Sequence, residues 1–275
     1  MVVNADASQI YADLRVLTAR PDAEDEGRVR HRLYGVRDGA QACSAAEWAT
    51  LATVEIAAAH GAGRVPVLVG GTGLYLRTLL DGIAPTPPID PQVRADVRAL
   101  SVEEAHAELS RADPDAAGRL NPADRQRVGR ALEIVRATGR TLADWQRTRA
   151  GGIGDDVALS AMVVEADAAT LPVRIEARLR AMIDAGALDE VAALLERGLD
   201  AGLPIMKAVG VRPFAVHLNG EIGLDEAIAR AAAETRQYAK RQRTWFRNQT
   251  PRWERIEAGA DVGRIIKLSL LEAER

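Results

Sequence analysis

Short apolar runs alternate with stretches of helical periodicity along most of the chain. The apolar runs predict strands at residues 1–5, 64–69 and 157–165, with a weaker one at 253–258. Apolar positions at helical spacing predict helices at residues 44–60, 74–80, 173–185, 189–197 and 224–246. Strands that alternate with helices indicate an α/β fold with a mainly parallel sheet.

The middle of the chain differs, because residues 90–147 show helical signals and no strand signal. Ser101 begins a capping box, Asn121 is the expected N-cap of the next helix, and Gly139 is the expected stop. Thr141 begins a further helix. We therefore predict a helical subdomain inserted into an α/β core: residues 1–86 for the first part of the core, 87–150 for the insertion, and 151–275 for the second part with a basic C-terminal helix.

Composition narrows the class of protein. Of the 275 residues 47% are apolar and 27% are charged, which supports a sizeable core and argues against global disorder. No apolar run approaches the length of a membrane span, and the N-terminus has no basic segment of the secretory type. Cys43 is the single cysteine, and the four histidines show no metal-site spacing. We expect a cytoplasmic protein without a membrane contact and without a protein-built metal site.

The charge distribution says more than the net charge of −3. Between residues 236 and 255 there are seven basic side chains and one acid, Glu254. Aromatic residues are interleaved with these cations at 238–247, a composition that suits stacking on RNA bases and contact with phosphates. A solvated helix face whose aromatics belong to the core is the alternative, and the local pattern leaves both open.

Two segments that follow predicted strands carry candidate chemistry. Asp6 ends the first strand, where a carboxylate can serve as a general base or as a helix N-cap, and the local sequence favours the cap. Gly70-Gly71-Thr72-Gly73 ends the second strand and begins a helix. The backbone N–H groups of such a turn can hold an anion, although a tight turn also needs glycine without any ligand.

Two arginine pairs at helical spacing are candidate phosphate contacts. Arg127 and Arg130 are three residues apart, and Arg174 and Arg178 are four apart, a geometry that suits a diphosphate. On the local sequence alone, an ordinary charged helix face with Glu133 is favoured for Arg127 and Arg130. For Arg174 and Arg178, salt bridges to Glu176 and Asp184 are the alternative.

The order of the motifs is more specific than any one of them. The chain closely resembles the bacterial tRNA dimethylallyltransferase family, also called tRNA isopentenyltransferase, from about its first residue to about Ala258. The resemblance rests on these blocks: Asp6-Ala-Ser-Gln-Ile-Tyr11, Thr18-Ala-Arg-Pro21, His31-Arg-Leu33, Cys43-Ser-Ala-Ala-Glu-Trp48, Leu68-Val-Gly-Gly-Thr-Gly-Leu-Tyr75, Asn121-Pro-Ala-Asp-Arg-Gln-Arg-Val-Gly-Arg-Ala-Leu-Glu133, Arg174-Ile-Glu-Ala-Arg178, Gly186-Ala-Leu-Asp-Glu190, Met206-Lys-Ala-Val-Gly-Val-Arg212 and Thr235-Arg-Gln-Tyr-Ala-Lys-Arg-Gln-Arg-Thr-Trp245.

The resemblance implies a phosphate-loop-kinase-like core whose helical insertion grips the tRNA anticodon stem-loop. The family transfers a dimethylallyl group from its diphosphate to the N6 amine of adenine 37, which is extruded into a channel. Asp6 and Thr72 match catalytic positions, which reverses the preference for a cap at Asp6, and Arg174 and Arg178 match diphosphate-binding ones. Mg²⁺ is the implied cofactor, and we expect a monomer. The positions that match tRNA-binding residues are Asp6, Ala7, Ser8, Gln9, Gly73, Arg94, Gln126, Arg127, Val128, Gly129, Arg130, Lys207, Arg212, Lys240, Arg241 and Arg247.

One departure from the family concerns its opening unit. A strand, a glycine-rich loop of the type GPTxSGK[ST] and a helix precede these blocks in the family, and the sequence given does not contain them. That loop holds the diphosphate and the metal in proteins of this type, so we expect weakened donor binding. The resemblance places the missing strand at the centre of the sheet. We therefore expect residues 1–5 to pair with 64–69 and residues 157–165 to pair with 253–258, with two facing sheet edges and no strand between them. Two alternatives to the enzyme are a tRNA anticodon-loop binder without catalysis and a small-molecule kinase; the basic C-terminal helix argues against the kinase.

Overall fold

The chain folds into two compact units. The computed structural model describes residues 1–260 and 263. Residues 1–79, together with the chain from Gly154 onward, form the α/β unit, and residues 80–153 form the helical unit. The inserted helical unit therefore interrupts the α/β unit in sequence, and each unit is described by itself below.

Parallel strands form two small sheets in the α/β unit. The first has the order β2-β1-β3, in which β1 (Val2–Asn4) pairs in parallel with both β2 (His31–Arg32) and β3 (Val67–Val69). The second joins β4 (Met162–Glu165) to β5 (Glu254–Glu257), also in parallel. Both predicted pairings are confirmed, although residues 157–161 do not belong to β4. Within the described residues no strand pair joins the two sheets, which leaves one edge of β3 without a strand partner.

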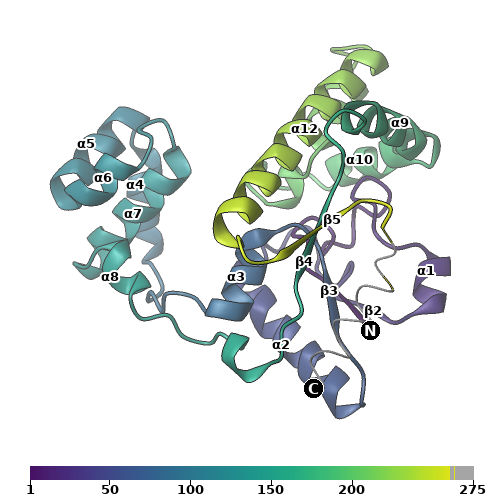
Figure 1. Cartoon of the computed structure of the whole chain (residues 1–275). Coiled ribbons are helices and arrows are strands. Elements are labelled where there is room, and N and C mark those ends of the chain that lie inside the picture. The colour runs from purple at the N-terminus through teal and green to yellow at the C-terminus, as the bar shows by residue number, and fades with distance from the viewer. Residues whose placement is uncertain (261–262, 264–275) are drawn as a thin grey trace. The chain divides into compact units, whose positions relative to one another are not determined.

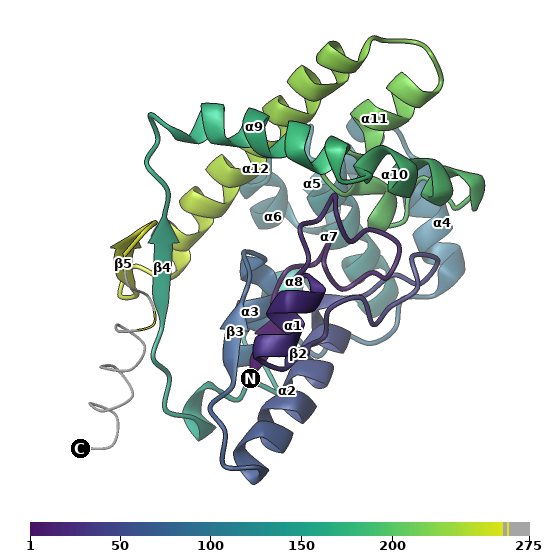
Figure 2. The same cartoon turned by 90° about the vertical axis from the view of Figure 1, so that its right-hand side faces the viewer.

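Helices lie beside the strands of the α/β unit and leave β4 partly exposed (Figure 1). Helix α12 packs against α9 and α11, and α10 packs against α11 (Figure 2). On the sheet side, the fully buried Trp48 stacks on Tyr75 with 4.6 Å between the ring centroids, which fixes α2 against α3. The helices are α1 (Ala23–Arg28), α2 (Ala45–Gly61), α3 (Gly73–Asp81), α9 (Leu171–Asp184), α10 (Ala187–Glu196), α11 (Val211–Leu218) and α12 (Leu224–Gln249), with one-turn helices η1 (Gly154–Asp156) and η2 (Ile205–Lys207).

The helical unit has a core of its own. Its core brings together Val97, Leu109, Val128 and Leu132 from three of its helices. Reciprocal capping boxes at Ser101 and Thr141 begin two of the helices, as the sequence predicts. The helices are α4 (Pro91–Ala99), α5 (Val102–Ala112), α6 (Pro114–Arg119), α7 (Arg125–Thr138) and α8 (Leu142–Gln146).

The predicted start of α7 is wrong by one short turn. Asn121 does not cap the helix; its side chain accepts the N–H of Ala123 and forms a turn that contains Pro122. The cap is Asp124, whose carboxylate accepts the N–H of Arg127, three residues into the helix. The stop is as predicted, because Gly139 adopts a left-handed φ of 66°. None of the helices in the described part of the chain is both long and apolar enough to span a membrane.

Candidate active site

Asp6 lies in a tight turn at the carboxyl end of β1. Its own N–H donates to Asn4 Oδ1 at 2.8 Å, and its Oδ1 accepts the N–H of Ser8 at 2.7 Å. No helix follows directly, since the next one along the chain is α1. The interpretation of Asp6 as a helix cap is therefore wrong. One carboxylate oxygen closes a turn by accepting the N–H of Ser8, and the other oxygen takes no part in that hydrogen bond.

Burial controls the ionisation of this carboxyl. Desolvation raises the pKa of Asp6, and hydrogen bonds from the backbone of Ser8 and Gln9 offset part of that effect. A carboxylate with a raised pKa accepts a proton more readily than an exposed one does. The turn therefore presents a partly desolvated base at the edge of the sheet where ligands bind in parallel α/β folds.

The glycine-rich turn after β3 lies against the Asp6 turn. Thr72 Oγ1 accepts the N–H of Ala7 at 2.9 Å, and the Thr72 N–H donates to the carbonyl of Ala5 at 3.1 Å. The two turns meet because β1 and β3 are neighbours in the sheet. The Thr72 N–H is thus used inside the protein, and Thr72 acts on the Asp6 turn through its hydroxyl.

One face of α12 closes over this glycine-rich turn. Gln242 Nε2 donates to the carbonyl of Gly71 at 3.1 Å, and the indole of Trp245 packs so closely on Gly73 that no side chain fits there. Tyr238 is hydrogen-bonded to Thr72 and Gln242, and burial together with the charge of Asp6 raises its pKa. The sequence did not identify Gln242, because its partner is more than 170 residues away.

Two further tyrosines lie within electrostatic reach of Asp6. Burial, and then the charge on Asp6, raise the pKa of Tyr34 to about 12. Burial is also the main cause of the raised pKa of Tyr75, to which Asp6 contributes. The charge on Asp6 thus favours the neutral form of three phenols from separate segments, Tyr34, Tyr75 and Tyr238.

The residues after Asp6 are held by the protein itself. The Gln9 amide donates to the carbonyls of Thr18 and Ala19, both at 2.9 Å, and Ala7 and Ser8 give their N–H groups to Thr72 and Asp6. All these contacts keep the Asp6 turn in one conformation.

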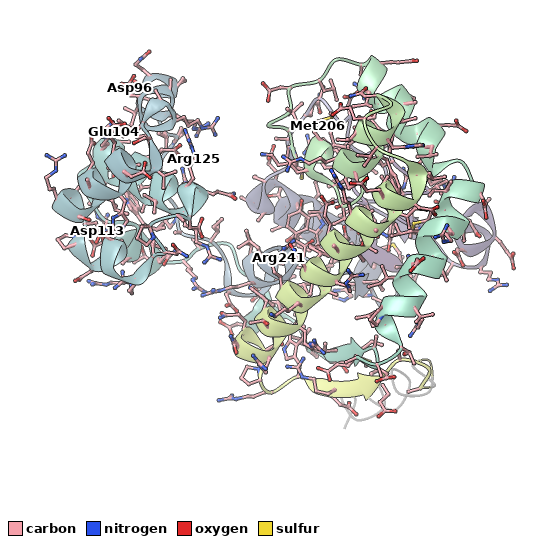
Figure 3. All side chains as sticks on the ribbon, turned by 90° about the horizontal axis from the view of Figure 1, so that it is seen from above. Asp96, Glu104, Asp113, Arg125, Met206 and Arg241 are labelled. Atoms are coloured by element: carbon pink, nitrogen blue, oxygen red, sulfur yellow. The ribbon has the colours of Figure 1, made fainter. Side chains whose placement is uncertain are left out.

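Several predicted tRNA-binding cations gather on the α/β unit. Lys207 of η2, Arg212 of α11 and Arg241 of α12 line one cavity of about 440 Å³, together with Glu234. Figure 3 labels two of its lining residues, Met206 and Arg241. Lys240 and Arg247 are exposed on α12. The structure therefore brings together positively charged residues from three segments separated in sequence.

Arg174 and Arg178, the predicted diphosphate pair, are both exposed on α9 but have different surroundings. Arg178 lines a second cavity of about 290 Å³ with Arg15 and Arg20. Arg174, one turn earlier, is not among the residues that line it. The sequence did not single out Arg15 or Arg20, which lie in the loop after the Asp6 turn.

In the helical unit, three arginines converge on one carboxylate. Glu133 of α7 is largely buried and lies 3.5 Å from Arg130, 3.9 Å from Arg98 and 4.0 Å from Arg94. Arg94 and Arg130 were predicted from the sequence; Arg98 and Glu133 were not. The cluster has an excess of positive charge on a partly exposed surface, which is the requirement for binding an anion.

The remaining predicted positions of α7 differ in exposure. Gln126 and Arg127 are exposed, and Gly129 lies beside Val97. The side chain of Val128 cannot contact RNA as placed here, because it is fully buried in the core of the helical unit. Helical periodicity places one residue of such a segment on the inner face.

The described residues do not form a dedicated metal cage. Within residues 1–260 and 263 no three His, Cys, Asp or Glu side chains lie together in a way that could hold a metal ion. Mg²⁺ often takes only one or two carboxylates, with phosphate oxygens and waters as its other ligands.

Comparison with known proteins agrees with this geometry. The family model described as "IPP transferase" matches residues 9–249 of the chain. The chain belongs to the IPP transferase family. The match covers the glycine-rich turn, the α7 segment and most of α12, so the residues described above lie within the family region, apart from the Asp6 turn just before it.

Relatives and solved structures of the family extend over nearly all of the chain. The tRNA dimethylallyltransferase of Sphingopyxis alaskensis is 61% identical over 91% of this chain and 82% of its own length. That of Novosphingobium aromaticivorans is 55% identical over 98% and 97%. The crystal structure of the tRNA isopentenylpyrophosphate transferase of Bacillus halodurans is similar with a TM-score of 0.69 and 30% identity, over 99% of this chain and 89% of that one.

Proposed function

We propose that this chain transfers a dimethylallyl group from dimethylallyl diphosphate to N6 of adenine 37, beside the anticodon of tRNA. The observation that carries the proposal is the desolvated Asp6 carboxylate, held beside the glycine-rich turn in a member of the IPP transferase family. The alternative of a tRNA binder without catalysis is not favoured, since close relatives over most of their length are named for the transfer reaction.

The chemistry follows from the position of the base. The adenine N6 attacks C1 of the dimethylallyl group, so that the N6–C1 bond forms while the C1–O bond breaks and diphosphate leaves. Asp6 takes the proton that N6 loses. Its raised pKa makes the proton transfer more favourable, and the hydrogen bond from Ser8 to one carboxylate oxygen orients the other. Thr72 keeps the Asp6 turn in register through the N–H of Ala7.

The basic residues are proposed as the binding surfaces of the two substrates. The cavity lined by Lys207, Arg212 and Arg241 supports phosphate contacts with the tRNA, as do the exposed Lys240 and Arg247 of α12. In the helical unit, the arginines around Glu133 support a second contact with the RNA backbone. The cavity beside Arg178, which Arg15, Arg20 and Asp22 also line, is proposed as the site of the diphosphate. Mg²⁺ bound to the diphosphate oxygens would neutralise the leaving group. We place the protein in the cytoplasm as a monomer.

The test is a transfer assay with tRNA that lacks the modification and radiolabelled dimethylallyl diphosphate, followed by digestion and mass spectrometry of the nucleosides. We expect N6-dimethylallyladenosine and one diphosphate released per group transferred. Asp6→Asn keeps the shape and removes the base, and should lower the rate by about 10²- to 10⁴-fold. Asp113→Asn is the matched control, because Asp113 is also buried, lies outside both cavities, and asparagine also caps α6. Absence of the modified nucleoside with the unaltered chain would refute the proposal.

A further inference from the structure

Asn4 is a fully buried polar side chain directly before the Asp6 turn. It is the last residue of β1 and has 0% exposure. Burial of an amide costs free energy unless its donors and acceptor are all satisfied, so a residue of this kind needs an explanation from its contacts.

The Asn4 side chain holds Asp6 from both sides of its backbone. Nδ2 donates to the carbonyl of Asp6 at 3.0 Å, and Oδ1 accepts the N–H of Asp6 at 2.8 Å. The second hydrogen of Nδ2 reaches the carbonyl of Leu33 at 3.0 Å. Both donors and the acceptor are therefore used, and two of the three bonds fix the residue that carries the proposed base.

The partners of Asn4 are themselves fixed. Leu33 has a left-handed φ of 63°, so its carbonyl points in a direction that ordinary backbone does not give. The Asn4 carbonyl accepts the indole N–H of the buried Trp48 at 2.9 Å. Hydrogen bonds of Asn4 thus link the Asp6 turn to β1, to α2 and to the loop at Leu33.

We propose that Asn4 is a positioning residue for the transfer reaction: it holds the backbone of Asp6 and so keeps the carboxylate oriented in its buried position. No contact between Asn4 and substrate is required. The inference rests on the proposed function for its kinetic consequences, whereas its effect on the ionisation of Asp6 can be measured without turnover.

Substitution of Asn4 should change both the rate and the pH profile. Asn4→Ala removes all three bonds and leaves space for water beside Asp6. Displacement of a reacting group by ~1 Å costs about 10²-fold in rate, so kcat should fall by about that factor while KM for tRNA stays unchanged. Because desolvation is what raises the pKa of Asp6, hydration lowers it, and the acid limb of the kcat profile moves to lower pH.

Titratable groups other than Asp6 also have to be considered in the pH profile of kcat. The charge on Asp6 contributes to the raised pKa of Tyr34, Tyr75 and Tyr238, and burial is the largest cause for each of these phenols. They change charge far above the acid limb. A shift of that limb therefore reports Asp6, and Asp6→Asn, which lacks the group, should abolish it.

The experiment compares Asn4→Ala and Asn4→Ser with Thr250→Val. The serine variant keeps one donor and one acceptor and should recover part of kcat. Thr250 is also buried and donates one side-chain hydrogen bond to a backbone carbonyl, that of Phe246, but lies outside the site. Thr250→Val should lower Tm while kcat and the acid limb stay at the values of the unaltered chain.

Carboxyl titration by NMR, assigned with Asp6→Asn, gives the Asp6 pKa independently of activity. A lower Asp6 pKa in the Asn4 variants supports the proposal. Asn4 variants that have a lower Tm but keep kcat and the Asp6 pKa would overturn it. If Asn4→Ala does not fold, the result with Asn4→Ser alone decides. If the unaltered chain transfers no dimethylallyl group, the proposed function fails, and the titration still tests Asn4.

Discussion

Gly70 occupies a position where even one methyl group has no room. It follows β3, and a Cβ built there would collide with the carbonyl carbon and oxygen of Ala5 and lie 2.6 Å from the nitrogen of Asp6. These are backbone atoms, so they cannot turn aside as a side chain does. The Ala5 N–H is bonded to the Val69 carbonyl at 2.8 Å, and the Ala5 carbonyl accepts the Thr72 N–H. Gly70→Ala must therefore push the Asp6 turn away from β3.

The size of the effect follows from this contact. Overpacking in a rigid core costs typically 1–3 kcal/mol, and a clash with hydrogen-bonded backbone belongs at the upper end, about 2–3 kcal/mol. For a domain of this size each kcal/mol lowers Tm by about 2–4 °C, so we expect a fall of roughly 4–12 °C. Displacement of Asp6 should also lower the transfer rate by about 10²-fold.

The assay pairs calorimetry with single-turnover transfer on the same preparation. Gly61→Ala is the matched control: Gly61 is the last residue of α2 in the same unit, and its Cβ would meet nothing within 4 Å. Alanine favours a helix over glycine, so this variant should melt at or above the Tm of the unaltered chain and transfer at the same rate. A Gly70→Ala protein with unchanged Tm and unchanged rate would show that the two turns are not in the contact described.

Three further outcomes are expected. Asp6→Asn should raise the free energy of unfolding at neutral pH. Folding raises the pKa of this carboxyl, so the cost of its charge is absent below the ordinary pKa of 3.8 and fully present above the folded pKa. Urea unfolding at several pH values would contradict this if the difference in stability between the two proteins did not grow with pH. Trp48→Phe leaves the Asn4 carbonyl without its partner and should cost about 1–3 kcal/mol, measurable by urea unfolding; a smaller loss would mean that the bond contributes little. Lys240→Ala and Arg127→Ala should each flatten the slope of log affinity for tRNA against log salt by about 0.7–0.9, and an unchanged slope would mark both as ordinary surface charges.

Local interactions explain most of what was predictable in the fold. Ser101, Thr141 and Gly139 act on N–H and carbonyl groups within a few residues of themselves, so their roles are legible in the sequence. The start of α7 shows the limit, because Asn121 and Asp124 both have side chains able to cap and only the path of the chain selects between them.

The candidate site was predictable in its centre and less so in its surroundings. Asp6 and Thr72 follow strands in the sequence and carry the family resemblance, and the structure places them in adjoining turns. No local pattern singled out Asn4, Gln242 or Glu133. An asparagine, a glutamine or a glutamate has the same local pattern whether it is exposed or buried against distant partners. Val128 was misplaced for the opposite reason: a motif that matches RNA-binding residues also includes the inward-facing residue of its helix.

The sequence by itself determined the class of fold, the inserted helical segment, the parallel pairing of β1 with β3 and of β4 with β5, and the carboxylate at the end of β1. Periodicity, caps and the order of motifs are properties of neighbouring residues, and they survive without tertiary context. Only the tertiary structure decided which polar groups are desolvated and which partners satisfy them: the Asn4 bonds to Asp6 and Leu33, the contact of Gln242 with Gly71 and the three arginines around Glu133. Burial is the main cause of the raised pKa of Asp6, and no local pattern encodes it, whereas the opposing hydrogen bonds from Ser8 and Gln9 are local.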